Sequence, residues 1–568
     1  MTRSYWTIIL GLSLSCAAIS SPVGAQPGTT IQGPTLDVRR PALEVPEARD
    51  PDVFELPDLT QRPGRLGASN GTRFTLDRID VAGVTILELA LIGGITSRYT
   101  GRSITQADLI QLRDELTALY VSQGYISSGA VIPDQDVSDG VLDVNMVEGR
   151  LDGVVVSGNT YLTDTYISDR LGVDGSILNA SDLQRDFQLF LEDRNVRRMD
   201  ARLVPGSQLG SANIEVEVEE ERRWDLAAFV GSDRAPSVGG VRGGFAGAYR
   251  TLFTAGDELS GEVGITEGLA DGRADYVFPI GVSRWSGRVF GSSANAEIQD
   301  EPLSSLGAES RSWSFGAGLT YPIIAEPGKS LIIQGSIDAT HVETELFGIP
   351  FDFSPGSVNG ETDYTTIRIS PLYNSFTNRR ALSLGASLAI GIDGEEALIS
   401  AAVIPEPQYW HLSADAVYVR RLSNSGRQLV LRGSGRYAEE SLYSTEKFAV
   451  GGLGSVRGYR KNALLGDRGL FASAEYQVPA SELMNAGDGG LFDPARFVFG
   501  VFVDASMVDN ADQLDPTTDT ISSAGLTVAW EINDNAALNA YWGHAFEELP
   551  FSDDFQDDGF GFQLVARF

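Results

Sequence analysis

The sequence has very little cysteine and histidine, the residues that form disulfides and most zinc sites. Its one cysteine, Cys16, lies in the first apolar stretch, and its three histidines, His341, His411 and His544, are far apart in the chain. Disulfides, thiol catalysis and cysteine metal sites are therefore excluded, and three dispersed histidines do not predict a zinc site. We expect no metal and no cofactor.

Positive charge, long apolar runs and enzyme motifs are also lacking. The chain carries 43 Lys and Arg against 77 Asp and Glu, so nucleic acid, which requires clustered cations, is not an expected partner. No internal run reaches the ~20 apolar residues of a membrane-spanning helix. There is no G-x-S-x-G nucleophile elbow, and the glycine-rich GGLGSV at Gly451 lacks the lysine of a phosphate-binding loop. We expect no catalytic residues and no enzymatic activity.

The first 71 residues have the composition of a leader and a linker. Residues 1–25 combine a positive start at Arg3, a short apolar core and small residues at Val23–Ala25, which is typical of a secretory signal peptide. Residues 26–71 are rich in proline, which breaks helices longer than about two turns. We expect export from the cytoplasm, followed by an extended, semi-rigid linker.

An internal repeat follows the linker. LDRIDVAG from Leu76 matches LDGVVVSG from Leu151, and each copy passes from a strand through a helical pattern to paired strands. The repeat predicts two small α+β modules, at residues 72–149 and 150–222.

Each module combines a helix with a pair of strands. Thr105, in a capping box with Asp108, begins the helix of the first module, and Asn179 begins that of the second. The predicted strands are residues 130–132 and 141–147 in the first module, and 201–204 and 214–218 in the second. An exposed strand edge can pair with an extended peptide, so we expect an unfolded client to bind there, unless the edges are spacers packed on another part. The candidate residues are Ala130, Val131, Ile132, Arg202, Leu203 and Val204.

From Trp224 to the C-terminus, apolar and polar residues alternate. In residues 312–321, for example, Trp313, Phe315 and Leu319 occupy one face and serines and glycines occupy the other. A period of two predicts strands. Alternation alone does not separate a membrane barrel from a soluble sandwich, which would bury its apolar face.

Three features favour a transmembrane β-barrel. Strands of about ten residues match a tilted membrane strand. Short turns, as at residues 322–328, alternate with long polar loops, as at residues 350–362. The chain also ends in an alternating strand on Phe568, which resembles the assembly signal of bacterial outer-membrane barrels. We predict a mostly β fold, in which residues 223–568 form an antiparallel barrel of about sixteen strands.

Residues 446–475 interrupt the alternation. Their many glycines and weak periodicity predict a long structured loop rather than a strand or helix. Arg457 is its most informative residue, because a guanidinium inside a barrel requires a carboxylate partner.

Together these stretches resemble the outer-membrane transporters of two-partner secretion, the TpsB type or haemolysin secretion/activation proteins. Residues 120–142 with the VEG at Val147, and residues 203–220, are similar to that family's two POTRA modules. The resemblance covers nearly the whole chain after the linker. The motif at the tip of the family's barrel loop six is matched by Val456, Arg457, Gly458 and Tyr459.

The resemblance implies a latch between loop six and the barrel wall. Arg457 would meet the aspartate of a strand motif Phe-x-Asp-x-Gly, which Phe502 and Asp504 match, whereas Ser506 replaces the last glycine. Family members often carry a plug helix before the first POTRA module. The proline spacing leaves no room for one of ordinary length, so we expect the plug to be absent or to be an irregular segment within residues 29–66.

The resemblance also implies location, partners and function. It places the barrel in the outer membrane of a Gram-negative bacterium and the POTRA modules in the periplasm. The partners would be a secreted exoprotein client (TpsA type), outer-membrane lipid, and the periplasmic chaperones and barrel-assembly machinery that insert the protein. The client would bind unfolded and be threaded through the barrel. Two alternatives remain open: a barrel-assembly insertase, which shares the modules and the loop motif, and a passive porin.

Overall fold

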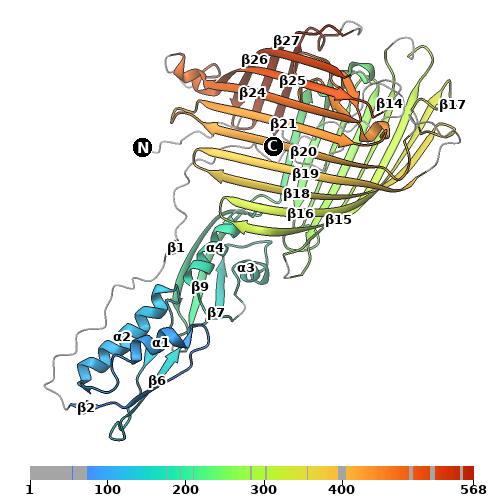
Figure 1. The fold of residues 1–568 in the computed structure, drawn as a ribbon. Coiled ribbons are helices and arrows are strands. Elements are labelled where there is room, and N and C mark those ends of the chain that lie inside the picture. The colour runs from blue at the N-terminus through green and yellow to red at the C-terminus, as the bar shows by residue number, and fades with distance from the viewer. Residues whose placement is uncertain are drawn as a thin grey trace. The chain divides into compact units, whose positions relative to one another are not determined.

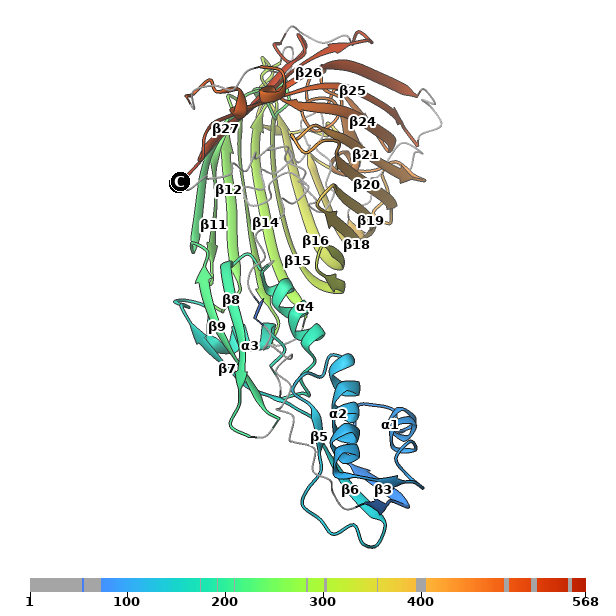
Figure 2. The ribbon, with the colours of Figure 1, turned by 90° about the vertical axis from the view of Figure 1, so that its left-hand side faces the viewer.

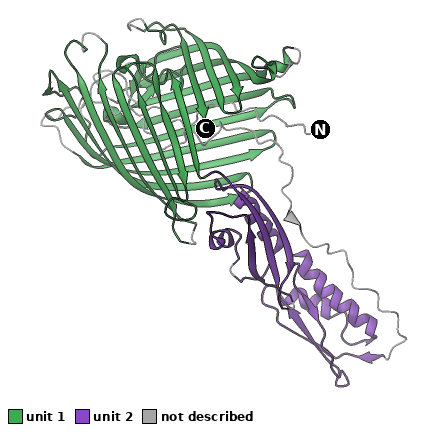
Figure 3. Ribbon diagram, turned by 180° about the vertical axis from the view of Figure 1, so that it is seen from behind, with its two compact units in different colours: residues 1–48, 223–568 green, residues 49–222 purple. Residues whose placement is uncertain are grey.

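The structure, a computed structural model, places the chain in two compact units. One lies within residues 49–222 and the other within residues 223–568 (Figure 3). The expected signal peptide lies outside the described residues, as do the linker and plug segment apart from Phe54 and Glu55. The structure describes residues 54–55, 73–173, 175–191, 193–208, 210–281, 284–300, 304–354, 356–394, 405–484, 490–511, 518–549 and 554–568.

The first module of residues 49–222 contains two helices and a three-stranded sheet (Figure 1). The sheet order is β3-β6-β5, with β3 parallel and β5 antiparallel to β6. The capping box is confirmed, because the side chains of Thr105 and Asp108 each accept the other's backbone N–H. Leu112, Leu116 and Tyr120 of α2 are buried in the core. The elements are β2 (Phe74–Thr75), β3 (Arg78–Ala82), α1 (Leu89–Thr96), β4 (Ser103–Ile104), α2 (Gln106–Ser122), β5 (Gly129–Val131) and β6 (Val141–Val147).

The second module has a similar order of elements. Asn179 begins α4 as predicted, because its Oδ1 accepts the N–H of Ser181 at 2.9 Å. Phe187 and Phe190 of α4 are buried against the sheet. Each module has one helix more than predicted, α1 and α3, and both are too short to show a helical period in the sequence. The elements are β7 (Leu151–Ser157), α3 (Asp164–Arg170), α4 (Ala180–Leu191), β8 (Val196–Pro205) and β9 (Ala212–Glu220).

The two modules repeat the same backbone conformation at one glycine. Gly83 after β3 and Gly158 after β7 have φ of +81° and +84°. A Cβ on either glycine would collide with a carbonyl oxygen of the central strand, that of Met146 in the first module and that of Val218 in the second. Both the left-handed backbone and the close approach require glycine.

A glutamate two residues beyond each of these carbonyls binds the loop that follows the glycine. Glu148, the acid of the VEG sequence, accepts the N–H groups of Thr85 at 2.7 Å and Ile86 at 3.1 Å and the hydroxyl of Tyr120 at 2.9 Å. Glu220 accepts the corresponding N–H groups of the second module. Partial burial would raise the pKa of Glu148, but the hydrogen bonds outweigh it and hold that pKa below its ordinary value.

Residues 223–568 form a closed antiparallel barrel of 16 long strands, as predicted (Figures 1 and 2). The barrel closes where β10 pairs with β28, from Ala227 opposite Arg567 to Gly231 opposite Gln563. No helix among the described residues is long and apolar enough to cross a membrane. The long strands are β10 (Trp224–Gly231), β11 (Arg242–Arg250), β12 (Glu258–Ile265), β13 (Leu269–Pro279), β14 (Ser286–Glu297), β15 (Glu309–Glu326), β16 (Lys329–Leu346), β18 (Glu361–Thr377), β19 (Arg380–Gly394), β20 (Trp410–Arg421), β21 (Gln428–Ala438), β24 (Arg468–Pro479), β25 (Phe497–Asp509), β26 (Asp519–Asn533), β27 (Ala536–Ala545) and β28 (Phe560–Arg567), with the short β17 (Ile349–Pro350) added to β16.

The exposed face of the barrel is the apolar one. Trp313 and Phe315 of β15 are 49% and 58% exposed, whereas Ser312 and Ser314 between and beside them are buried. A soluble sandwich would bury the aromatic face instead. The structure therefore resolves the ambiguity of the alternation in favour of a membrane barrel.

Two boundaries differ from those predicted. The turn predicted at residues 322–328 is shorter, because β15 continues to Glu326 through an irregular register at Pro322, and bulges accommodate proline in a strand. The loop predicted at residues 446–475 ends earlier, because β24 begins at Arg468. Gly469 lies within β24 and obscured the alternation there.

The Glu148 carboxylate should make the first module sensitive to acid. Folding lowers the pKa of Glu148, so its carboxylate stabilises the module at pH values above the ordinary pKa of glutamate. This stabilisation is lost as the pH falls through the pKa that Glu148 has in the folded state. At pH 7, Glu148→Gln should lower the free energy of unfolding of a residue 49–222 fragment by about 1 kcal/mol, and at pH 4 the difference should be smaller. Denaturant titrations at both pH values measure this.

Glu88→Gln is the matched control, because Glu88 is exposed and its side chain makes no helix-capping hydrogen bond. It should unfold like the wild type at both pH values. A difference between wild type and Glu148→Gln that does not change with pH would contradict the role given to the charge.

Candidate functional site

The candidate site is the long loop between β21 and β24, residues 439–467. Because strand direction alternates from β10, the connections at this end of the barrel follow β10, β12, β14, β16, β19 and β21, which makes this loop six. It contains the 3₁₀ turn η2 (Ser444–Glu446) and a two-stranded ribbon of β22 (Phe448–Val450) and β23 (Leu464–Gly466). Val456, Arg457 and Tyr459 at its tip are buried.

Arg457 meets Asp504, which is the contact that the resemblance implies. The Arg457 Nε donates to Asp504 Oδ2 at 2.8 Å, Nη2 donates to Oδ1 at 2.9 Å, and the Arg457 backbone N–H donates to Oδ2 at 3.1 Å. The side chains are 1% and 0% exposed. A bidentate, fully buried pair is the strong form of the guanidinium–carboxylate interaction.

A second carboxylate of the wall, Glu475, was not predicted. It pairs with Arg457 Nη1 and accepts from Arg432 Nη2 of β21 at 3.2 Å. Its other oxygen accepts from Gln477 at 2.7 Å and from Thr527 at 2.9 Å. Glu475 lies in alternation with the inward-facing residues of β24. Recognising that strand in the sequence would have predicted that Glu475 points into the barrel. We call Arg457, Asp504 and Glu475 the Arg457 anchor.

Aromatic side chains complete the packing around the anchor. The Arg457 guanidinium lies 3.6 Å from the centroid of the Phe502 ring, a cation–π distance. The Tyr459 hydroxyl lies 3.0 Å from the carbonyl oxygen of Ser522 and 2.8 Å from a carboxylate oxygen of Glu547, both within hydrogen-bonding distance. The tip of loop six is therefore bound to β25 on one side and to β26 and the loop after β27 on the other.

Gly458 brings the loop backbone against the wall. Its φ is +97°, and a Cβ there would lie 3.0 Å from the backbone of Gly543 in β27. Gly559, before β28, also lies against Gly543. Three glycines thus meet where the tip touches the last strands of the barrel.

Ser506 replaces glycine in the strand motif without leaving a polar group unpaired. It is buried, and its hydroxyl donates to the carbonyl of Leu470 on β24 at 2.9 Å. Phe502 and Asp504 keep their inward positions on β25. The departure from the motif therefore leaves the geometry of the Arg457 anchor intact.

Solved structures share this fold. CdiB from Escherichia coli superimposes with a TM-score of 0.63 at 16% identity, covering 90% of this chain and 93% of that chain. BamA from Haemophilus ducreyi, lacking POTRA domains 1–3, gives 0.52 at 13% identity, covering 87% and 100%. At such identities the likeness establishes the fold alone.

Sequence comparison identifies the family. The ShlB-type POTRA domain matches residues 74–149, and the haemolysin secretion/activation protein family ShlB/FhaC/HecB matches residues 210–492. The outer membrane transporter CdiB of Dickeya dadantii (strain 3937) is 25% identical over 84% of each chain. The chain belongs to the haemolysin secretion/activation family. It is a transporter whose barrel lies in the outer membrane and whose POTRA modules lie in the periplasm.

The two strand edges that were predicted to bind a client, those of β5 and β8, differ in whether another strand already pairs with them. In the first module β5 is an edge strand, and the N–H of Ala130 donates to Thr117 of α2 at 3.1 Å. Val131 is the exposed residue of β5, and Ile132 lies just after it. In the second module the predicted edge of β8 is partly occupied.

The occupant of the β8 edge is a piece of the linker. Phe54 and Glu55 form β1, which pairs in parallel with β8 opposite Ala201 and Arg202. The prediction of a free edge at Arg202 is therefore wrong, because proline content concealed a short strand in the linker. Leu203 and Val204 continue β8 beyond the pairing.

The remaining predicted residues lie on the barrel. Phe568 directly follows β28, and its N–H donates to the carbonyl of Leu226 at 2.9 Å; its role as an assembly signal stays a prediction. His341, His411 and His544 lie on β16, β20 and β27. Among the described residues, no three potential ligands are grouped to hold a metal ion.

Loss of Arg457 should release loop six. Arg457→Ala leaves Asp504 and Glu475 buried with only Arg432 to balance them, and breaking a buried ion pair costs about 3–5 kcal/mol. In planar bilayers, the variant should spend more time than the wild type in an open state of high conductance. Its rate of client secretion should differ from that of the wild type.

Arg380→Ala is the matched control, because Arg380 begins β19 and is exposed. It should behave like the wild type in both assays. Normal conductance and normal secretion by a correctly inserted Arg457→Ala variant would contradict a latch role for Arg457.

Proposed function

We propose that this transporter binds an unfolded exoprotein through its POTRA modules and threads it through the barrel to the cell surface, with loop six moving to open the way. The observation that carries the proposal is the combination of a ShlB-type POTRA module with a closed barrel whose loop six is held by a buried ion pair. A polar anchor can release and re-form, whereas the strands of the wall stay paired.

The β5 edge is the favoured first contact for the client. Among the described residues no strand pairs with the outer side of β5, and Val131 is exposed there. Strand addition supplies backbone hydrogen bonds that do not depend on client sequence, which suits a long unfolded chain. On β8, by contrast, a client would have to displace Phe54 and Glu55 or bind beyond them, at Leu203 and Val204.

Folding of the client outside the cell supplies the energy in this proposal. The sequence has no phosphate-binding loop, since GGLGSV at Gly451 lacks the required lysine. No catalytic step is assigned to the chain. Periplasmic chaperones and the barrel-assembly machinery would deliver and insert the transporter itself, and lipid would contact its apolar outer face.

The ShlB-type match of the first module favours secretion over the insertase alternative. The match of residues 210–492 to a family of secretion proteins disfavours the porin alternative.

Deletion of the transporter should remove one large protein from the culture medium. Comparing the medium of wild-type and deletion strains by mass spectrometry measures this and identifies the client. An unchanged medium together with a general loss of outer-membrane barrels would instead support the insertase. A large steady conductance of the wild type would support the porin.

A lysine on the β5 edge should weaken client binding. Val131→Lys places a charge on an exposed edge position, and charged side chains block strand pairing. We expect binding of the client's N-terminal segment to the residue 49–222 fragment to weaken about tenfold, equivalent to ~1.4 kcal/mol, and secretion to fall.

Val155→Lys is the matched control on the edge strand β7 of the second module, where Val155 is 58% exposed. It should bind the client normally. If Val155→Lys weakened binding and Val131→Lys did not, the client would use the second module instead.

A further inference from the structure

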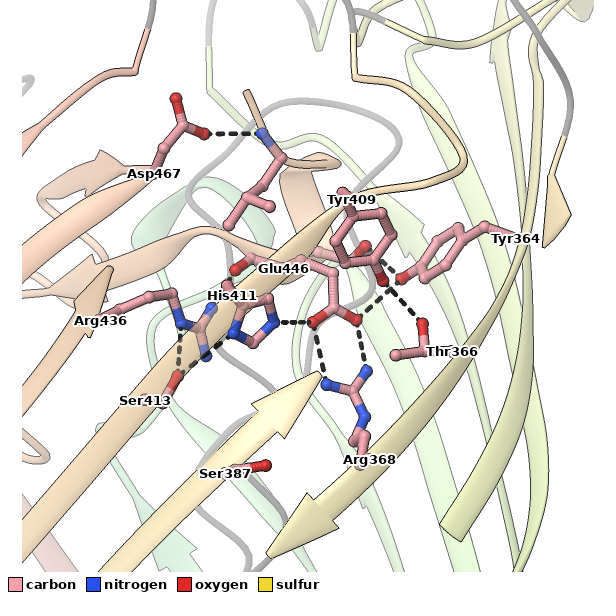
Figure 4. A network of polar contacts seen from close by, with 12 residues as sticks. Tyr364, Thr366, Arg368, Ser387, Tyr409, His411, Ser413, Arg436, Glu446 and Asp467 are labelled. Carbon is pink, nitrogen blue, oxygen red and sulfur yellow. Dashed lines mark hydrogen bonds and ion pairs between the residues drawn. The ribbon is translucent and has the colours of Figure 1, made fainter. Parts of the chain in front are cut away.

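A second buried polar cluster holds the other arm of loop six. Its centre is Glu446, at the end of η2, before the ribbon that leads to the tip. Glu446 is 2% exposed, and its partners come from β18, β20 and β21 of the wall. The Arg457 anchor engages these strands only through Arg432 of β21. Figure 4 shows the Glu446 carboxylate between Arg368 and His411.

The Glu446 carboxylate is bound on both oxygens. Arg368 of β18 donates to Oε2 at 3.1 Å and to Oε1 at 2.5 Å, and His411 Nε2 of β20 lies 2.9 Å from Oε2. The Arg368 Nε donates to Asp338 of β16 at 3.2 Å. We call Glu446, Arg368 and His411 the Glu446 anchor.

The backbone of the arm is fixed as well. Arg436 of β21 donates from Nη1 to the carbonyl of Glu446 and from Nε to the hydroxyl of Ser413 at 2.9 Å. Thr445 pairs with the hydroxyl of Tyr364 on β18. Both the side chain and the main chain of the arm are therefore tied to the wall.

Aromatic rings exclude water from this anchor. Tyr364 stacks on Tyr443 of the loop with centroids 4.6 Å apart and an interplanar angle of 7°. Tyr409 stacks on His411 and shares a hydrogen bond of 2.6 Å with Thr366. Ionic hydrogen bonds are stronger in such a dry site than in water.

The wall does not need this cluster in order to close. Strands β16 to β21 pair with one another through continuous backbone ladders. Replacing a buried ion cluster with apolar residues is often neutral or stabilising, whereas removing one partner is costly. The cluster also binds the N-terminal arm of loop six. Its role is therefore to hold that arm against the wall.

We propose that Glu446 is a positioning residue for loop six and forms a second anchor, independent of Arg457, which must also release before the loop moves. Within the part of the chain that the structure describes, the two anchors share no hydrogen-bonding partner: Arg457 binds Asp504 and Glu475, whereas Glu446 binds Arg368 and His411. Strand β21 serves both, with Arg432 at one anchor and Arg436 at the other. Loop six is thereby held at its tip and at its N-terminal arm.

Planar-bilayer recordings of the full chain test the second anchor without any client, so failure of the proposed secretion function would not affect the result. Glu446→Gln keeps the shape of the side chain and removes its charge. It should raise the open probability about tenfold. Glu440→Gln, in the same loop at an exposed position, is the matched control and should behave like the wild type.

A double-mutant cycle tests the pairing itself. If Glu446 and Arg368 act together, the combined Glu446→Gln and Arg368→Gln variant should open less often than the product of the two single effects predicts. Glu446→Gln combined with Arg457→Ala should open more often than either variant alone, because the two anchors are separate.

Open probabilities for Glu446→Gln equal to those of Glu440→Gln, in barrels shown to be folded by their resistance to detergent unfolding, would overturn the proposal. If Glu446→Gln does not insert into the bilayer, the same recordings are made on Tyr364→Phe. This variant removes the hydrogen bond to Thr445 and leaves no charge unpaired. It should raise the open probability about threefold, and no change would overturn the proposal.

Discussion

Charges inside the barrel must be neutralised within the chain, and this constraint fixes loop six. Around the tip, Asp504 and Glu475 of the wall face one cation of the wall, Arg432, which leaves one negative charge for Arg457. Around the N-terminal arm the imbalance has the opposite sign. There, Arg368 and Arg436 face one acid of the wall, Asp338, which leaves one positive charge for Glu446.

The two imbalances orient the loop. A cation at the tip and an anion at the arm match their sites only when the loop is inserted in one direction. Uncompensated charge in either site would be costly in a dry environment. Loop six is thus specified by charge complementarity at two places, in addition to the apolar packing of Val456, Tyr459 and Phe448 near the tip.

Much of this architecture could be predicted from local pattern. A period of two predicted the strands, and Thr105 and Asn179 predicted the starts of two helices, because each signal lies within a few residues of its effect. Strand length, the turns and loops and the ending on Phe568 then favoured a membrane barrel. The pairing of Arg457 with Asp504 followed from a resemblance, supported by the need of a buried guanidinium for a counter-charge.

The rest depends on contacts between distant segments. Glu446 lies in a glycine-rich loop, and its partners Arg368 and His411 come from two separate strands whose registers no local pattern defines. Glu475 was hidden because Gly469 interrupts the alternation of β24. The strand formed by Phe54 and Glu55 is two residues long, and in a proline-rich segment only the β8 edge beside it reveals that it exists.

The contact of Gly458 with Gly543 bears on how quickly the loop can leave. Side chains that interlock must change rotamers before two surfaces separate, but here backbone faces backbone with no side chain between them. At this contact no side chain has to move before the tip separates from β27, although the packing of Val456 and Tyr459 and the stacking of Arg457 on Phe502 must still be lost. The buried charges of Arg457 and Glu446 add an electrostatic part to the activation barrier, so ions or client groups that compete for them would change the rate of opening as well as its equilibrium.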